Sequence, residues 1–253
     1  MKLPEPWCSS DVAVVLPTFN EAGNLPEIVT ELFDLPLPRL TIFVVDDNSP
    51  DGTGQIADDL SDKFGEDRLI VVHRRKKEGL GRAYVDGMTH ALDAGAQYVV
   101  QMDSDLSHSP QYLPQMLGTL LSTQADVVIG SRYVTGASLA EEWGWHRRLL
   151  SRWASIYVQA LLHIKVRDVT AGFKLWRRSA LEAIDLRSVS SDGYSFQVEM
   201  NYRAVELGLK IVEVPIRFYE RNAGTSKMSL KVQIESALVP FRLRSRDRHP
   251  RPS

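Results

Sequence analysis

The first half of the chain alternates between short apolar runs and longer amphipathic segments. The apolar runs are rich in valine and isoleucine and have the length of buried strands. The segments between them have apolar residues at helical spacing. Continuously apolar strands separated by helices predict a mainly parallel sheet that is buried on both faces. The predicted strands cover 12–16, 40–45, 68–73, 96–102 and 125–130, and the predicted helices cover 24–34, 53–64, 80–95 and 111–122.

The second half is less regular, and it shows no internal repeat and no linker that would separate two domains. Its predicted elements are amphipathic helices over 147–164 and 229–242, a mixed strand and turn over 168–178, a helix over 195–207 and an alternating strand over 210–218. Pro240 is expected to kink or end the second amphipathic helix. We therefore predict one domain over 1–228, an amphipathic interface helix over 229–242 and a disordered basic tail over 243–253.

The segment 147–164 has two interpretations. Its apolar and polar residues fall on opposite sides, which is typical of a helix that packs on a core. Aromatic residues with arginines at the flank are also typical of a helix that lies in a membrane interface, and we favour that interpretation. The apolar side carries Leu149, Trp153, Ile156, Tyr157 and Ala160, and the other side carries Arg148, Arg152, Ser155 and Gln159.

Composition narrows the class of protein. The 253 residues include 30 Lys and Arg against 32 Asp and Glu, so no strong positive field suggests nucleic acid as a partner. Cys8 is the only cysteine, which excludes internal disulfides and fits a reducing compartment. The N-terminus has no signal-peptide pattern, and no apolar run approaches the roughly 18 residues that span a bilayer. We expect a cytoplasmic protein that is soluble or peripheral to a membrane.

Polar motifs follow the predicted strands where open α/β sheets bind ligands. The first is "LPTFNEAGN" (16–24), in which Pro17 is expected to end the pairing of the strand and Asn20 and Glu21 take ligand-facing positions. A plain strand-to-helix turn with a capping asparagine stays an equal alternative. The second is "VVDDNSPDGTG" (44–54), in which Asp46 or Asp47 can accept hydrogen bonds from a nucleoside. On its own, this motif is explained better by turn chemistry.

The third motif is "VVQMDSDLSHSP" (99–110), which places two carboxylates at the end of an apolar strand. Asp103 and Asp105 point to the same side if the strand continues, because alternate residues share a face. Such a pair suits Mg²⁺ or Mn²⁺, with diphosphate oxygens completing the shell. A helix cap before Pro110 is the alternative. The fourth motif, "GSRYVTGA" (130–137), offers Arg132 either for phosphate or as a surface arginine.

With these motifs in this order, the chain resembles the family 2 glycosyltransferases, and within them the dolichol-phosphate and polyprenol-phosphate mannose synthases. The resemblance runs over about 11–228. It implies a GT-A nucleotide-sugar fold and inverting transfer of mannose from GDP-mannose to a polyprenyl monophosphate at the inner face of a membrane. It rests on "PTFNEAGN", "VVDDNSPDGT", "GLGRAY", "MDSDLSH", "GSRYVTG", "DVTAGFKLWRR" and "EVPIRFYERNAGTSK".

The resemblance also implies roles for single residues. The guanosine contacts would come from Pro17, Phe19, Glu21, Val44 and Asp46. The donor phosphates would be held by Asp103, Ser104 and Asp105. The metal positions are Asp103, Asp105 and Ser107, where Ser107 stands in place of the glutamine of some relatives.

For the acceptor phosphate, the resemblance implies a set of basic residues with one serine. Arg132 and Arg221, together with Asp105, are the residues expected to act most directly in catalysis. The motif "AGFKLW" departs from the usual S-G-F-R form at Ala171 and Lys174. The acceptor-phosphate set is Arg132, Arg147, Ser151, Arg221 and Lys227.

The chemistry implied by these residues needs no strong general base. The acceptor is a phosphate monoester with a second pKa of about 6, so it is largely dianionic at neutral pH. His108, the nearest histidine, is therefore expected to be structural. Two alternatives stay open: a UDP-glucose-dependent polyprenyl-phosphate glucosyltransferase, and a nucleotide-sugar-binding subunit without turnover. Expected partners are GDP-mannose, polyprenyl phosphate, a membrane surface and a separate membrane-anchoring subunit, without nucleic acid.

Overall fold

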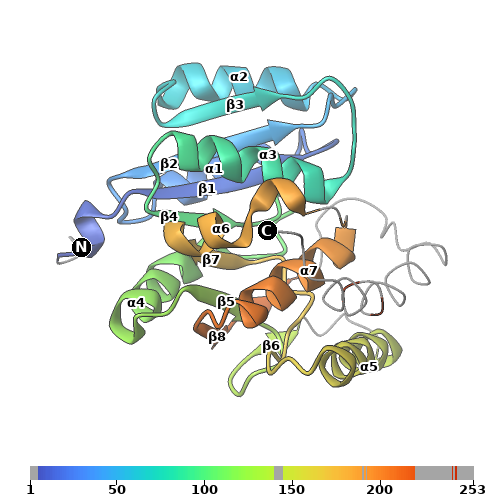
Figure 1. Ribbon diagram of the computed structural model, residues 1–253. Coiled ribbons are helices and arrows are strands. Elements are labelled where there is room, and N and C mark those ends of the chain that lie inside the picture. Colours follow the sequence, from blue (N-terminus) through green and yellow to red (C-terminus); the bar gives the residue numbers. More distant parts are fainter. Residues whose placement is uncertain are drawn as a thin grey trace.

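The computed structural model describes residues 5–139, 145–189, 191, 193–219, 241 and 243. In this part of the chain, helices cover both faces of one seven-stranded sheet, and the predicted mainly parallel α/β class is confirmed (Figure 1). The strand order is β3-β2-β1-β4-β7-β5-β8. The seven strands are β1 (Val12–Thr18), β2 (Leu40–Asp46), β3 (Leu69–His73), β4 (Tyr98–Gln101), β5 (Val127–Ser131), β7 (Lys174–Arg177) and β8 (Ile211–Pro215).

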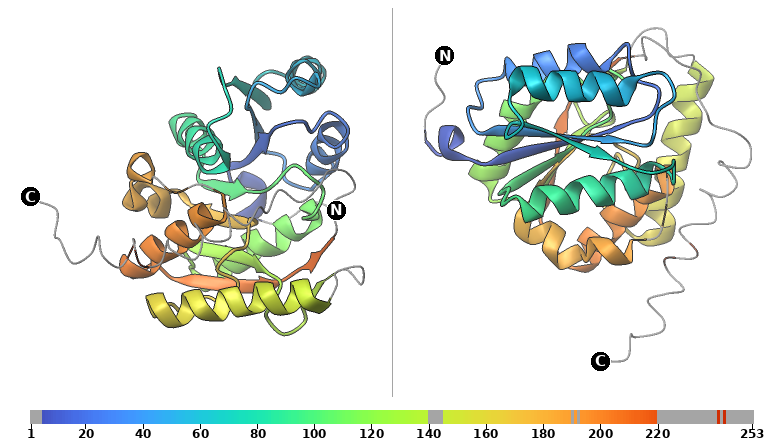
Figure 2. Two further views of the ribbon diagram at one scale, coloured as in Figure 1. Left: turned by 90° about the vertical axis from the view of Figure 1, so that its right-hand side faces the viewer. Right: turned by 90° about the horizontal axis from the view of Figure 1, so that it is seen from above.

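Strand β7 runs against both of its neighbours, whereas the other pairs in this sheet are parallel. Its first residue, Lys174, pairs with Gln101 at the end of β4 and with Ile129 in β5. The chain therefore enters β7 at the edge where β1, β2 and β4 end. We call this edge, on the right in Figure 1 and facing the viewer in the left view of Figure 2, the ligand edge. Sequence patterning did not predict the reversal.

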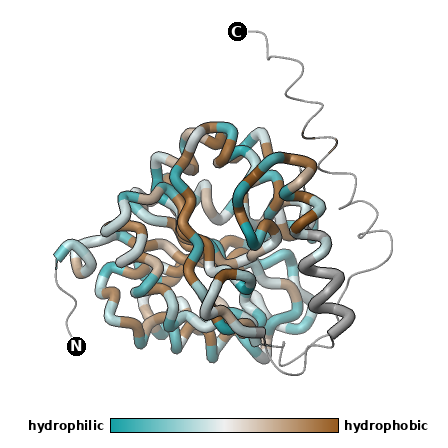
Figure 3. The backbone as a smooth tube through the Cα atoms, turned by 90° about the horizontal axis from the view of Figure 1, so that it is seen from below, coloured by the Kyte–Doolittle hydropathy of each residue, from teal (hydrophilic) through white to brown (hydrophobic). Residues whose placement is uncertain are grey.

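The helices form two layers, which the right view of Figure 2 shows on opposite sides of the sheet. Alternate strand residues point to opposite faces, so each face has its own apolar cluster. One cluster includes residues of α1 (Leu25–Phe33), α2 (Thr53–Phe64) and α4 (Leu113–Thr123). The other includes residues of α3 (Leu80–Asp93), α5 (Trp145–Leu162), α6 (Arg178–Ile184) and α7 (Gly193–Glu206). In Figure 3 the hydrophobic stretches accordingly run through the middle of the molecule.

Most predicted elements are present with shifts of a few residues at their ends, and two expectations about strands were wrong. Pro17 does not end the pairing of β1, because Pro17 lies opposite Val45 and Thr18 opposite Asp46 in the ladder with β2. The strand expected over 210–218 is two strands. Its second part, β9 (Arg217–Phe218), leaves the main sheet and pairs with β6 (Ser138–Leu139). Helix α6, which follows β7 directly, was not predicted.

Helix α5 turns its apolar side outward in its described part. Trp153 is 63% exposed and Ile156 is 54% exposed, and the rings of Trp153 and Tyr157 stack at 5.6 Å. Ser155, on the side opposite Trp153, is only 1% exposed, because the helix packs inward through Ser155, Val158 and Leu162. None of the described helices is both long enough and apolar enough to cross a bilayer. The predicted segments 229–242 and 243–253 lie outside the described residues, apart from Phe241 and Leu243, and the predicted boundary at 228 stays a prediction.

Candidate active site

The ligand edge brings together residues that are distant in the sequence. Asp46 ends β2, Asp103 and Asp105 follow β4, and Asp168 lies in the segment that leads into β7. The predicted phosphate-binding Arg132 follows β5, which neighbours β7. The structure therefore places the predicted donor-binding aspartates and Arg132 along one edge of one sheet.

Asp103 is held from two sides. The hydroxyl of Tyr84, in α3, donates a hydrogen bond to Asp103 Oδ1 at 2.6 Å. Gly172 closes the other side, since a Cβ atom at this position would lie 2.8 Å from Asp103 Oδ2. Burial, reinforced by the charges of Asp103 and Asp105, raises the pKa of Tyr84 well above its ordinary value. The phenol therefore stays a neutral hydrogen-bond donor at neutral pH.

Asp105 and its neighbours form a tight turn after Asp103. Asp105 Oδ1 accepts a hydrogen bond from the backbone N–H of Ser107 at 3.0 Å, and Ser104 Oγ donates to the carbonyl of Pro17 at 2.8 Å. Pro17 thus contributes a carbonyl that links the turn to β1. Ser107 is buried beside Asp105, with its Oγ 3.4 Å from His108 Nδ1. A ligand role for Ser107 stays a prediction.

His108 packs against aromatic rings, which fits the expected structural role. Its ring centroid lies 5.5 Å from that of Phe173 and 5.2 Å from that of Phe218. Burial lowers the pKa of His108 more than the carboxylates of Asp103 and Asp105 raise it. The imidazole is therefore neutral at physiological pH.

Arg132 makes an ion pair that the sequence did not predict. Its Nε and Nη2 donate to the two carboxylate oxygens of Asp168 at 2.8 and 2.7 Å, and its backbone N–H also donates to Asp168 Oδ2. Nη2 further donates to Thr170 Oγ1 at 2.8 Å. Burial alone would raise the pKa of Asp168, but the charge and hydrogen bonds of Arg132 outweigh it and lower the pKa. The guanidinium is fixed in direction before any phosphate arrives.

The predicted nucleoside contacts Asp46 and Glu21 lie in two loops that are joined by hydrogen bonds, and their role stays a prediction. Ser49 donates to Asp46 from both its backbone N–H, at 3.2 Å, and its hydroxyl, at 2.5 Å. Glu21 accepts from Asn24 Nδ2 at 2.8 Å. Asp51 accepts from the backbone N–H of Thr53 and so supports the start of α2. Its burial would raise the pKa of Asp51, but these hydrogen bonds lower it.

Two basic residues of the β3–α3 loop, Arg74 and Lys77, lie close enough to Asp47 for their charges to act on it. Arg74 forms ion pairs with Asp47, Glu78 and Asp86. Burial raises the pKa of Asp47, and the charge of Arg74 offsets this only in part. Lys77 Nζ lies 3.5 Å above the ring centroid of Phe19, a predicted guanosine contact. The run of four basic residues at 74–77 is the sequence feature that could have indicated these contacts, although it was not used to predict them.

Lys174, the residue that departs from the usual motif, is fully buried. Its Nζ donates to Gln197 Oε1 at 2.6 Å, and Gln101 Nε2 donates to the same oxygen at 2.6 Å. Burial lowers the pKa of Lys174 to about 7, and the charges of Asp168 and Asp103 limit the shift. This residue adds a titratable charge next to the carboxylates.

The donor set fits a divalent cation that also takes oxygens from a bound diphosphate. No group of three or more His, Cys, Asp and Glu side chains within the described ranges is arranged to hold a metal ion. Asp103 and Asp105 supply hard oxygen ligands, and the single hydrogen bond from Tyr84 uses only part of the acceptor capacity of Asp103. Protein sites for Mg²⁺ commonly use one or two carboxylates and substrate phosphates.

Several predicted residues are not brought into this group by the described contacts. Val44 is fully buried in the apolar cluster on the α1 side of the sheet. Arg147 and Ser151 lie on α5, in a part of the helix whose side chains are outside the described ones. Arg221 and Lys227 lie outside the described residues. Their roles stay predictions.

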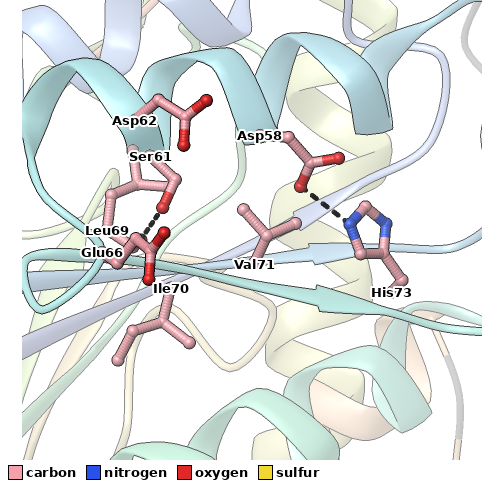
Figure 4. Close-up of a pocket in the computed structure, with 8 residues that line it drawn as sticks. All are labelled: Asp58, Ser61, Asp62, Glu66, Leu69, Ile70, Val71 and His73. Carbon is pink, nitrogen blue, oxygen red and sulfur yellow. Dashed lines mark hydrogen bonds and ion pairs between the residues drawn. The ribbon is translucent and has the colours of Figure 1, made fainter.

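A depression beside the outermost strand of the sheet contains none of the predicted site residues (Figure 4). It lies between α2 and the edge strand β3. His73 Nε2 and Asp58 Oδ1 are 2.9 Å apart there, and Ser61 Oγ donates to the carbonyl of Leu69. Its lining residues are Asp58, Ser61, Asp62, Glu66, Leu69, Ile70, Val71 and His73.

Comparison with protein families identifies the fold and the chemistry class. Residues 13–185, more than half of the chain, match the model for glycosyl transferase family 2. The chain belongs to this family. Among curated relatives of this family 2 glycosyltransferase, polyprenol monophosphomannose synthase of Mycolicibacterium smegmatis is 46% identical over 85% of this chain and 80% of its own length. Undecaprenyl-phosphate mannosyltransferase of Micrococcus luteus is 43% identical over 86% of this chain and 87% of its own length.

Solved structures of other glycosyltransferases share the fold of this family 2 glycosyltransferase. A mannosyltransferase from Pyrobaculum calidifontis, in complex with GDP-Man and Mn²⁺, superposes with a TM-score of 0.63 at 18% identity, over 94% of this chain and 64% of that one. Glucosyl-3-phosphoglycerate synthase from Mycobacterium tuberculosis gives a TM-score of 0.67 at 20% identity, over 94% and 78%. The expected GT-A architecture is thereby confirmed.

Proposed function

We propose that this glycosyltransferase moves mannose from GDP-mannose to a polyprenyl monophosphate, with inversion at C1 and with the help of a divalent cation. The observation that carries the proposal is the pair of curated relatives. Both are named for mannose transfer to a polyprenyl phosphate or for its product, and each is matched over at least 80% of its length. The carboxylates and cations of the ligand edge support it, because donor and acceptor are both anionic.

The donor side of the proposed site uses carboxylates to bind a diphosphate through a cation. Asp103 and Asp105 would hold Mg²⁺ or Mn²⁺, which would neutralise charge on the departing diphosphate. Asp46 and Glu21 would contact the nucleoside at the neighbouring strand ends. A solved relative of the same fold contains GDP-Man together with Mn²⁺, which supports this assignment of donor and metal class.

The acceptor side would use arginine. Arg132 is oriented by Asp168 and Thr170, so it loses little side-chain freedom when it meets a phosphate. The acceptor phosphate is itself the nucleophile and is largely dianionic at neutral pH, so no general base is required. Catalysis would then consist of holding both substrates in line and stabilising the charge. Arg147, Arg221 and Lys227 are proposed to complete the acceptor site.

The deciding experiment incubates the purified protein with GDP-mannose or UDP-glucose, with and without a short-chain polyprenyl phosphate and with or without Mn²⁺. We expect GDP release and mannolipid only when GDP-mannose, acceptor and cation are all present. Preference for UDP-glucose would favour the glucosyltransferase alternative. Binding of the nucleotide sugar without turnover would favour the non-catalytic subunit.

We further propose that α5 rests on the surface of the membrane that holds the acceptor. The exposed side chains of Trp153 and Ile156 support this, since large apolar groups stabilise binding to a lipid interface. A Trp153→Gln/Ile156→Gln variant should sediment less with vesicles of mixed anionic and neutral lipid than the unmodified protein. Its activity on a short-chain soluble acceptor should be unchanged. Equal sedimentation of both proteins would refute this placement, and recruitment by a membrane subunit stays a separate prediction.

A further inference from the structure

The tyrosine of the motif "GLGRAY" has no role in the chemistry proposed above, yet it contacts the candidate metal site. Tyr84 is fully buried in α3, and its hydroxyl is 2.6 Å from Asp103 Oδ1. We propose that Tyr84 is a positioning residue, whose hydroxyl holds the carboxylate of Asp103 in the orientation that binds the divalent cation and the donor diphosphate. This inference rests on the proposed function, because it gives Asp103 the role of metal ligand.

The tyrosine ring is itself fixed on the sheet. It stacks on the ring of Phe196, from α7, with centroids 5.6 Å apart and planes inclined by 4°. Gly87, one turn further along α3, lets the helix approach the strands closely, because a Cβ atom there would lie 2.4 Å from Val15 Cγ1 and 2.7 Å from Val45 Cγ2. The hydroxyl therefore has a defined position over the end of β4, and ring rotation cannot easily remove it from Asp103.

The opposite side of the carboxylate is closed by backbone. A Cβ atom at Gly172 would lie 2.8 Å from Asp103 Oδ2 and 3.4 Å from His108 Cε1. The carboxylate is thus confined between a hydroxyl from α3 and the segment before β7. Metal ligands are commonly oriented by such outer partners, and their loss typically reduces metal affinity by about 10–100-fold.

A neutral donor suits this task better than a cation would. Two other carboxylates at the ligand edge, Asp47 and Asp168, pair with arginines, which balance their charge inside the protein. Tyr84 orients Asp103 without adding a positive charge. The negative charge of Asp103 therefore stays available to a cation that arrives with the donor.

The test is the binding of Mn²⁺ to the full-length Tyr84→Phe variant in the presence of GDP, measured from the electron paramagnetic resonance signal of free Mn²⁺. We expect affinity to fall by about 10–100-fold relative to the unmodified protein. In the transfer assay the Mn²⁺ concentration for half-maximal rate should rise by a similar factor, while KM for the lipid acceptor should not change. Tyr98→Phe, which removes a hydroxyl from a buried tyrosine of β4, is the matched control and should bind Mn²⁺ within about twofold of the unmodified protein.

Gly172→Ala provides a second variant that displaces the same carboxylate from the other side, and it decides the matter if Tyr84→Phe does not fold. It too should weaken Mn²⁺ binding. Normal Mn²⁺ affinity in the folded variants would overturn the positioning role, even if their thermal stability fell. An unmodified protein that binds Mn²⁺ with GDP but transfers no mannose would overturn only the proposed function. One that binds no Mn²⁺ would overturn both.

Discussion

Asp103 and Asp168 lie at the same edge of the sheet but have opposite kinds of partner. Asp168 receives three hydrogen bonds from Arg132, so its charge is balanced inside the protein. Asp103 receives a hydrogen bond from the neutral phenol of Tyr84, and within the described ranges it forms no ion pair. A carboxylate that already pairs with an arginine mainly supports structure, whereas one oriented by a neutral donor keeps its charge for a ligand.

The largest loss of stability is expected when the carboxylate that pairs with an arginine is removed. Asp168→Ala removes the carboxylate that balances the charge of the 9%-exposed side chain of Arg132, and loss of one member of a buried pair costs about 3–5 kcal/mol. We expect the free energy of unfolding in urea to fall by that amount. The double variant Asp168→Leu/Arg132→Met should recover most of the loss. A decrease below about 1 kcal/mol would contradict a structural role for the pair.

Removing a carboxylate that is a proposed metal ligand should reduce activity strongly and stability only slightly. Asp105→Ala is expected to lower kcat by about 10²–10³-fold, by analogy with the loss of one group that stabilises transition-state charge. Its free energy of unfolding should change much less than that of Asp168→Ala. Asp11→Ala is the control for loss of a carboxylate at the opposite edge of the sheet, because Asp11 lies just before the start of β1. Transfer of mannose at the normal rate by Asp105→Ala would refute the metal assignment.

Lys174 lies between the two kinds of carboxylate, since the charges of both Asp168 and Asp103 act on its pKa. The pKa is about 7 in the folded protein and about 10.4 in an unfolded chain, so above pH 7 the unfolded chain binds more protons. Stability should therefore rise with pH, by about 1.5 kcal/mol between pH 7.0 and 8.5 relative to Lys174→Met. Urea unfolding of both proteins at the two pH values measures this difference. A difference that is constant with pH would contradict the lowered pKa.

The smallest change in the free energy of unfolding is expected for a surface carboxylate, which is neither part of a buried ion pair nor a proposed metal ligand. Asp58 pairs with His73 at the surface, and the two side chains are 45% and 52% exposed. Exposed ion pairs contribute about 0–1 kcal/mol, so Asp58→Asn should change the free energy of unfolding by less than about 1 kcal/mol. The same urea titration gives this value. A larger loss would mean that exposure does not separate structural from surface pairs in this protein.

The parallel half of the fold was predictable because its strands are buried on both faces. Continuous apolar runs such as 12–16 and 40–45, rich in Val and Ile and alternating with helical patterns, indicate strands that are covered on both faces. Strand β7 was harder, because "KLWRR" carries charges and its direction depends on neighbours that sequence patterning does not show. Helix α6 is short and follows β7 without a loop, so no turn residues indicate where it begins.

The candidate site was predictable as a set of strand ends, but its internal partners were not. Asp103, Asp105 and Arg132 follow strands and carry suitable chemistry, so their positions drew attention. Tyr84 and Asp168 were not singled out, since they are typical of a core helix and a loop when only neighbouring residues are considered. Their contacts with Asp103 and Arg132 depend on how α3 and the segment before β7 pack on the sheet.

The reversed direction of β7 has a consequence for altering the enzyme. Because the chain enters this strand at the ligand edge, the segment 166–173 reaches Arg132 without belonging to the parallel strand–helix units that carry Asp46 and Asp103. Most of its side chains, among them Val169 and Phe173, are buried in the core, while Thr170 is a direct partner of Arg132. A change at Thr170 would therefore alter the support of Arg132, on the proposed acceptor side, while the strand–helix units that carry Asp46 and Asp103 stay unchanged.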